Sequence, residues 1–193
     1  MTVSNTDGDE RIAACAKTGD RAAFEILVRR HKIGLYRFIR RYVGQTDDAY
    51  DVLQSAFVSA WTGLKHYDPG RPFVPWLRVI ALNKCRDFAR RQTVRRVILQ
   101  AFANYSAAEP FTQLPDRERG EETIEAERLA RLDRAIAELP AFYREPLLLT
   151  TVSGLSHQEV AVMLKTTPKA IEMRLYRARR RILGAMNSGT TEG

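Results

Sequence analysis

The chain has 193 residues, which is long enough for one large domain or two small ones. Its composition, 45% hydrophobic and 28% charged, is typical of a folded protein and excludes a wholly disordered one. It has no apolar run near the roughly 18 residues that a membrane span needs, and its first residues do not resemble a signal peptide. We therefore expect a cytoplasmic protein without membrane insertion.

The net charge of +8 is distributed unevenly along the chain. Residues 1–92 contain 16 basic and 10 acidic residues, residues 93–128 contain 5 and 7, and residues 129–193 contain 10 and 6. The middle block has proline, glycine and acidic residues but few large apolar ones, which is typical of a linker. The sequence thus predicts two small domains, 1–92 and 129–193, joined by a flexible linker over 93–128. The basic surplus of both domains indicates a polyanionic partner.

Helical periodicity dominates the first domain, and no segment keeps the alternation of a strand. The predicted fold is therefore all-α. The elements expected in chain order are a helix over 24–42 that ends at Gly44, a second helix capped by Asp47 or Asp48 and running to about Gly63, a loop over 65–72, and a third helix from about Val74 to Arg91 with a possible extension to Ile98.

The second domain ends in a helix-turn-helix pattern. Ser156 and Glu159 have the spacing of a capping box and open a short helix. After a turn at 165–166, Thr167 can cap a longer helix whose first residue is Pro168, where the missing N–H has no cost. We expect this helix to bury Ile171, Leu175, Ala178 and Ile182. A short helix, a tight turn and a longer basic helix are typical of DNA-binding proteins.

Two interpretations of the basic face of this last helix are open. It can be the solvated side of an ordinary helical hairpin, as most charged faces are. The two caps and the regular spacing of the arginines favour DNA binding, with base contacts in the first turns and phosphate contacts later. The candidate contacts are Ser156, Thr167, Lys169, Ala170, Glu172, Met173, Arg174, Arg177, Arg180 and Arg181. The charge of Glu172 suits a cytosine amino group but repels phosphate.

Three segments carry a resemblance to a known family. Residues 48–61, DAYDVLQSAFVSAW, resemble region 2.2 of bacterial sigma factors. Residues 72–91, PFVPWLRVIALNKCRDFARR, resemble regions 2.3 and 2.4, and residues 139–182 resemble region 4. Their order is similar to that of the extracytoplasmic-function (ECF) group of the sigma-70 family, the smallest sigma factors. The resemblance implies an alternative sigma factor, which is not an enzyme and which directs RNA polymerase to the promoters of a stress or environmental-response regulon.

The resemblance implies two contacts with core RNA polymerase. Region 2.2 of the family binds the β′ coiled coil, and region 4 meets the β flap. The residues implied for the coiled coil are Asp48, Asp51, Val52, Gln54, Ser55 and Val58. A polar strip backed by an apolar face suits docking onto a preformed helical partner. The alternative is a surface helix whose aspartates lie near its positive N-terminus. Ser55 stands where the family commonly has glutamate.

The resemblance also implies that the promoter −10 element is read as a single strand, with one base captured by the loop over 65–72. The candidate residues are His66, Tyr67, Asp68, Arg71, Trp76, Arg78, Asn83, Lys84, Arg86, Arg90 and Arg91. Asn83 is the leading candidate for a base contact, because its amide both donates and accepts. Arg90 and Arg91 suit the DNA backbone. Trp76 fits the core nearly as well, and Asp87 can orient neighbouring arginines instead of touching DNA.

The linker and the partners follow from the same resemblance. A linker of 36 residues reaches up to about 120 Å, whereas two turns of duplex are roughly 70 Å. One domain can therefore bind the −35 element while the other binds −10. In the family the linker threads the core enzyme, so its acidic residues can mimic nucleic acid. The family also suggests an anti-sigma factor that clamps both domains.

Other functions compete with this interpretation. A helix-turn-helix repressor or activator accounts for residues 129–184 but not for region 2.2, and a sigma mimic would have a decayed DNA surface. No arrangement typical of an enzyme is present, and no cofactor is expected. The spacing of Cys15, Cys85 and the three histidines matches no zinc pattern, so free buried thiols are expected. Pro146 should kink its helix, expected over 141–152, or shift the start of that helix.

Overall fold

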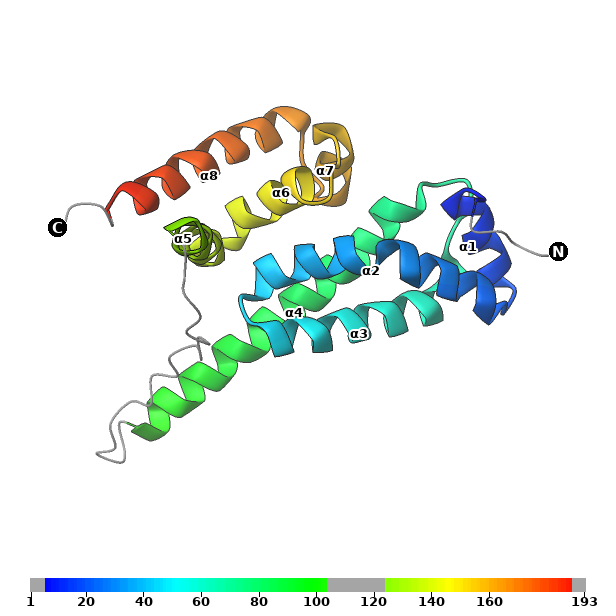
Figure 1. The fold of residues 1–193 in the computed structure, drawn as a ribbon, viewed down its shortest axis with the longest axis horizontal. Coiled ribbons are helices and arrows are strands. Elements are labelled where there is room, and N and C mark those ends of the chain that lie inside the picture. The colour runs from blue at the N-terminus through cyan, green and yellow to red at the C-terminus, as the bar shows by residue number, and fades with distance from the viewer. Residues whose placement is uncertain (1–5, 104–123, 189–193) are drawn as a thin grey trace.

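The computed structural model describes residues 6–103 and 124–188. Within these ranges every regular element is helical, which confirms the predicted all-α class. The helices form two bundles (Figure 1): the first bundle holds α1–α4, and the second bundle holds α5–α8. Among the described helices, none combines the length and the apolar composition that crossing a bilayer requires.

The first bundle begins with a helix that the sequence analysis did not predict, α1 (Asp9–Lys17). Helix α2 (Arg21–Val43) starts where the Asp20 side chain accepts a hydrogen bond from the Ala23 amide at 3.1 Å. It ends as expected at Gly44, whose φ of +94° lies in the left-handed region that glycine adopts readily. Helix α3 (Thr46–Gly63) starts earlier than predicted, and neither Asp47 nor Asp48 is its cap, because that position belongs to Gln45.

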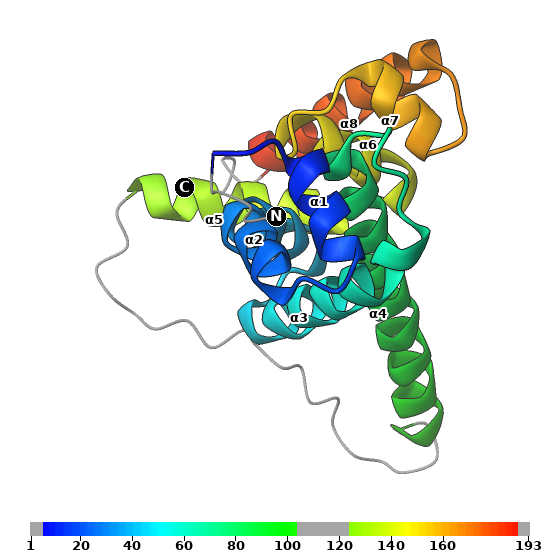
Figure 2. The same cartoon turned by 90° about the vertical axis from the view of Figure 1, so that its right-hand side faces the viewer.

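The short 3-10 turn η1 (Leu64–His66) leads into a loop, and the long helix α4 (Phe73–Ala103) follows. The predicted extension of this helix past Arg91 is confirmed, and the predicted domain boundary at 92 falls inside it. Its C-terminal part projects beyond the rest of the first bundle in both views (Figures 1 and 2). Val94, Val97, Ile98 and Leu99 on this part are each about half exposed or more.

The second bundle consists of α5 (Ile124–Glu138), α6 (Ala141–Thr151), α7 (His157–Met163) and α8 (Pro168–Ser188). Helix α6 begins directly after Pro140 and continues through Pro146, so the proline does not shift the start of the helix. Both predicted caps are confirmed. Ser156 and Glu159 form a reciprocal capping box at the start of α7, and the Thr167 hydroxyl accepts from the Ala170 amide at 3.2 Å.

Apolar side chains fill both bundles. In the first bundle Leu35, Phe38 and Ile39 of α2 are fully buried, and in the second bundle Leu148, Leu149 and Ile171 are. Ile171, Leu175 and Ala178 are buried as predicted, and Ile182 is partly buried against the same core. The two bundles are in contact, because α5 and α6 pack against α2 and α7 approaches α4 (Figures 1 and 2). The second bundle therefore covers one side of the first.

Candidate nucleic-acid and polymerase interface

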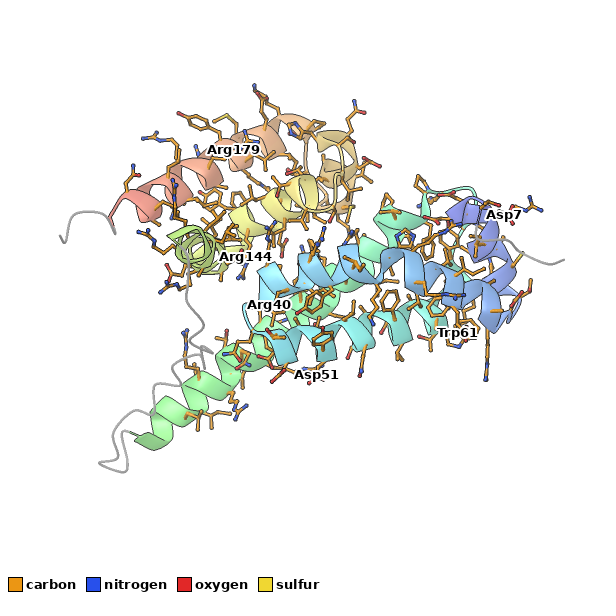
Figure 3. The ribbon with its side chains drawn as sticks, viewed as in Figure 1. Asp7, Arg40, Asp51, Trp61, Arg144 and Arg179 are labelled. Atoms are coloured by element: carbon orange, nitrogen blue, oxygen red, sulfur yellow. The ribbon has the colours of Figure 1, made fainter. Side chains whose placement is uncertain are left out.

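The polar strip expected on α3 is present. Asp51, Gln54, Ser55 and Val58 are exposed, and Asp51 projects from the outer side of α3 in Figure 3. Asp48 is half-buried at the same side, whereas Val52 is buried and supports the strip from inside. Val58 is 64% exposed and gives the polar strip an apolar contact point.

A groove between α3 and α4 joins the strip to basic side chains. Its α3 side includes Asp48, Asp51 and Ser55, and its α4 side includes Lys84, Asp87, Phe88, Arg91 and Arg95. Carboxylates and guanidinium groups thus face each other across one cleft. The residues that the resemblance implies for the polymerase and for DNA are therefore neighbours, and a partner in this groove would contact both sets.

The residues predicted on α4 divide between the surface and the interior. Positions 76, 79, 83, 86 and 90 follow helical spacing and share one face. Asn83 and Arg90 are exposed, and Arg90 pairs with Asp87 at 2.8 Å, as the orienting interpretation of that aspartate expected. Arg91 is also exposed, and Lys84 is half-buried.

Arg78 does not lie at the surface, contrary to its place among the DNA contacts. It is 6% exposed, donates to the Gly34 carbonyl at 3.0 Å and lies over the Phe38 ring. Burial lowers the pKa of Arg78 to about 10. Since this side chain faces α2, its role in the structure is to tie α4 to α2, and it is not placed to meet DNA.

The end of η1 and the loop after it present His66, Asp68 and Arg71 to solvent, with an ion pair of 3.5 Å between Asp68 and Arg71. Tyr67 is buried instead, at 1% exposure, and its hydroxyl donates to the Arg71 carbonyl at 2.5 Å. Burial raises the pKa of Tyr67 to about 12. The predicted place of Tyr67 among the −10 contacts is therefore corrected: Tyr67 is an internal anchor of the loop.

Trp76 is partly buried beside this anchor, with its ring 5.0 Å from that of Tyr67 and 5.5 Å from that of Phe73. It also helps to line a groove that runs from the loop to α7. The core interpretation and the surface interpretation of Trp76 thus each describe part of the side chain.

Helix α1 supplies residues that the sequence analysis missed. Lys17 Nζ donates to the Tyr67 carbonyl at 2.8 Å, and Glu10 Oε1 accepts from the Phe73 amide at 3.1 Å. Asp9 binds Arg30 at 2.7 Å and His31 at 2.8 Å, which fastens α1 to α2. Burial lowers the pKa of His31 despite this carboxylate. No local motif marks these residues, because each contact joins positions far apart in the chain.

Arg86 of α4 points toward the second bundle. Its Nε and Nη2 donate to the two carboxylate oxygens of Glu145 in α6, at 2.8 Å and 2.6 Å. Its Nη1 makes a longer hydrogen bond to Asn83 Oδ1, at 3.4 Å. The hydrogen bonds that Arg86 donates to Glu145 raise the pKa of Arg86. Tyr42 Oη donates to the same carboxylate at 3.3 Å, and burial raises the pKa of Tyr42 to about 12. Glu145, which carries these contacts, was not predicted as a functional residue.

Of the predicted contacts in the helix-turn-helix, some side chains are used in structural contacts and others are exposed. The hydroxyls of Ser156 and Thr167 act in the caps. Lys169 and Glu172 are exposed and paired at 2.8 Å, and the hydrogen bond from Lys169 lowers the pKa of Glu172. Met173 is 43% exposed, and Ala170 is half-buried.

The arginines of α8 differ in their contacts: some extend into solvent, and others stack on aromatic rings. Arg177 and Arg180 are exposed, as is Arg179, which the sequence analysis left out and which Figure 3 labels. Arg174 lies over the Phe142 ring at 3.9 Å, and Arg181 lies over the Tyr143 ring at 5.0 Å. Stacking of this kind keeps a guanidinium oriented while its outer donors stay available.

Over the described ranges 6–103 and 124–188, no three His, Cys, Asp or Glu residues are grouped as a metal site needs. Both cysteines are free thiols, with Cys15 half-buried and Cys85 buried. Burial raises the pKa of the Cys85 thiol, which makes it a poor nucleophile.

Comparison with known proteins identifies the family of this chain. The family models for Sigma-70 region 2 and for Sigma-70, region 4 match residues 27–95 and 129–182. These matches span most of α2–α4 in the first bundle and most of the second bundle. Helix α1 lies outside both.

Two curated relatives extend over nearly the whole chain. The RNA polymerase sigma factor CnrH of Cupriavidus metallidurans is 36% identical over 184 residues, which are 94% of this chain and 96% of CnrH. The ECF RNA polymerase sigma factor SigM of Mycobacterium tuberculosis is 30% identical, over 94% of this chain and 87% of SigM.

A solved structure agrees with them. CnrH in complex with the cytosolic domain of CnrY superposes with a TM-score of 0.70 at 32% identity, and the match covers 94% of this chain and 99% of the other. The chain accordingly belongs to the ECF group of sigma-70 family RNA polymerase sigma factors, which are not enzymes and which direct RNA polymerase to promoters.

Proposed function

We propose that the chain divides its work between residues 1–92, which bind core RNA polymerase and the −10 element, and residues 129–193, which bind the −35 element. The observation that carries this proposal is the exposed face of α4. There Asn83 is exposed, Arg90 and Arg91 are exposed about two helical turns further along α4, and the segment before α4 offers exposed His66 and Arg71. An amide reads base edges, and arginines hold the backbone of a single strand.

The energetics of promoter opening suit this face. Separating a base-pair step costs about 1.4 kcal/mol, and stacking of a captured base contributes about 1–3 kcal/mol. One extruded base held by the loop therefore offsets the loss of about one step. We assign this capture to the exposed loop residues His66, Asp68 and Arg71, with Trp76 at the edge of the groove. Lys84, Arg90 and Arg91 hold the backbone, and Arg86 joins them when it is released from Glu145.

The polymerase contact is assigned to the polar strip on α3. Asp48, Asp51, Gln54, Ser55 and Val58 form it, and Val52 supports it from inside. A rigid helix with a polar surface and one exposed apolar residue suits a preformed helical partner such as the β′ coiled coil. Asp48 and Asp51 offer charges to basic side chains, while Ser55 can contribute only a hydrogen bond.

The −35 contact is assigned to α8. Lys169, Glu172 and Met173 in its first turns are the base contacts, and Arg177, Arg179 and Arg180 are the phosphate contacts. Because Lys169 and Glu172 are already paired, base contact by either one requires their ion pair to rearrange.

We further propose that the protein acts in the cytoplasm, that it binds a protein partner there, and that it serves a stress or environmental regulon. The solved structure of CnrH holds the cytosolic domain of CnrY, and this likeness supports an anti-sigma partner for the present chain.

Reconstituted transcription tests the proposal. Core RNA polymerase and sheared genomic DNA are incubated with and without the protein, and the 5′ ends of transcripts are sequenced. We expect new start sites that share a −35/−10 pair. The Asn83→Ala variant should lose about 10- to 100-fold of its discrimination between the cognate and a substituted −10 base, since one good base contact contributes about 1–3 kcal/mol.

Asn187→Ala is the matched control, because Asn187 is an exposed helical asparagine near the end of α8. It should keep the selectivity of the parent. If no new start sites appear and the protein does not co-elute with core polymerase, the proposed function is wrong. New start sites with unchanged −10 selectivity in Asn83→Ala would reject the role of Asn83 alone.

A further inference from the structure

Glu145 of α6 is a carboxylate in the contact between the two bundles. It is 7% exposed, and both of its oxygens are held by Arg86 of α4, at 2.8 Å and 2.6 Å. A bidentate pair of arginine and carboxylate uses the same fork of donors that arginine offers to a phosphate. Glu145 therefore takes the place at Arg86 that a DNA phosphate would need.

Further contacts hold the bundles together around this pair. Tyr42 Oη donates to Glu145 at 3.3 Å. Arg144 donates to the Tyr42 carbonyl at 3.2 Å, and its guanidinium lies 4.3 Å from the centre of the Tyr42 ring. Within its own bundle Arg144 also donates to the Ala137 carbonyl at 2.8 Å. Figure 3 shows Arg144 between the two bundles. Since Glu145 and Arg144 are adjacent in α6, one turn of this helix carries most of the polar contact with the first bundle.

The second bundle also faces the loop that we assign to base capture. A groove is lined on one side by His66, Arg71 and Trp76, and on the other by Val162 and Met163 of α7. Val162 is 80% exposed, so α7 borders the groove without filling it. Arg86 and the loop are thus both approached by the second bundle, at two separate points.

This arrangement conflicts with the geometry of a promoter. The −10 and −35 elements are separated by about two turns of duplex, roughly 70 Å. Two bundles that touch along α2, α5 and α6 cannot reach both elements at that distance. Residues 104–123 join α4 to α5, and a chain of this length can span up to about 70 Å. Separation of the bundles is possible and must break the Glu145 contacts.

We propose that the −10 face of the first bundle is an interaction surface for the second bundle of the same chain, and that Glu145 competes there with promoter DNA for Arg86. The inference rests on the proposed function, because it needs Arg86 and the loop to act at the −10 element. In the closed arrangement Arg86 is neutralised by Glu145. Binding of the −10 strand requires the pair to break, so the free protein is held in a form that binds DNA weakly.

The test combines two measurements on the full chain. Small-angle X-ray scattering gives the radius of gyration, expected at about 16 Å for a compact chain of this length. Fluorescence anisotropy gives the affinity for a single-stranded oligonucleotide with the −10 sequence of a promoter found by the transcription assay. The variant is Glu145→Ala. Its matched control is Glu138→Ala, which removes an exposed carboxylate from the neighbouring helix α5.

We expect Glu145→Ala to increase the radius of gyration by several ångström. Its affinity for the −10 strand should rise by about tenfold, because the closed form then lacks the two hydrogen bonds from Arg86 and the one from Tyr42 Oη. Glu138→Ala should change neither value. Tyr42→Phe removes only the hydroxyl that donates to Glu145, and it should give a smaller increase of both, about threefold in affinity. If circular dichroism shows that Glu145→Ala is unfolded, the radius of gyration and the affinity of Tyr42→Phe test the inference instead.

Each other outcome has a defined meaning. An unchanged radius of gyration in Glu145→Ala and Tyr42→Phe would overturn the inference, as would an expanded molecule whose affinity for the −10 strand equals that of the parent. If the parent supports no promoter-dependent transcription with core polymerase, the proposed function fails. The scattering data still decide in that case whether Glu145 closes the molecule.

Discussion

The two bundles hold their proposed DNA-reading elements in different ways. In the second bundle, α7 and α8 are fixed by contacts between residues three positions apart, such as Ser156 with Glu159 and Thr167 with Ala170. In the first bundle, the loop before α4 is fixed from α1, where Lys17 holds the Tyr67 carbonyl across 50 positions. A substitution near the N-terminus can therefore change the −10 loop, whereas α8 depends mainly on its own neighbourhood.

The largest effect should come from removing the internal anchor of the loop. Tyr67→Ala deletes a ring that packs against Phe73 and Trp76. We expect a loss of about 3–5 kcal/mol in the free energy of unfolding, as for other buried aromatic residues. Tyr67→Phe keeps the ring and loses only the bond to the Arg71 carbonyl, so about 1 kcal/mol is expected.

Urea denaturation followed by circular dichroism measures both values. His66→Ala is the control for the same loop, because His66 is exposed, and its stability should remain within about 0.5 kcal/mol of the parent. If Tyr67→Ala is no less stable than His66→Ala, the assignment of Tyr67 to the interior is wrong.

The same contrast explains which features of the structure could be predicted from the sequence and which could not. The capping box at Ser156, the stop at Gly44 and the buried stripe of α8 were predicted because each depends on residues a few positions apart. The exposed strip of α3 followed from helical spacing and the family resemblance. Arg78 was misplaced, and Glu10, Lys17 and Glu145 were missed, because their hydrogen-bond partners lie 44 to 103 positions away in the chain. Tyr67 was misplaced as well, and its carbonyl is held by Lys17 across 50 positions. Spacing carries no information about such contacts until the helices have packed.

The brace from α1 gives the second expected effect. Lys17→Met keeps the length of the side chain but removes the charged donor to the Tyr67 carbonyl. We expect a loss of about 1.5 kcal/mol in stability and faster hydrogen exchange of the loop amides, measured by mass spectrometry on peptides that cover 64–73. Lys65→Met alters an exposed lysine next to the loop and should leave this exchange unchanged. Equal exchange in both variants would mean that α1 does not hold the loop.

The smallest effect belongs to the local cap and depends on pH. The Ser156 hydroxyl and its backbone amide donate to Glu159, and these hydrogen bonds lower the pKa of that carboxyl. Ser156→Ala should cost about 1 kcal/mol at pH 7, the usual contribution of an N-cap.

Below about pH 4 the unfolded chain takes up a proton at Glu159 more readily than the folded one, so the stabilisation from the lowered pKa is lost as pH falls. Ser156→Ala has already lost the hydroxyl part of it, so the stability difference between the parent and Ser156→Ala should shrink from pH 7 to pH 3. All other carboxylates are shared by the two proteins and cancel in the difference. A difference that stays constant over this range, in urea denaturation at both pH values, would show that the hydroxyl stabilises α7 only through the Glu159 amide and not through its carboxylate.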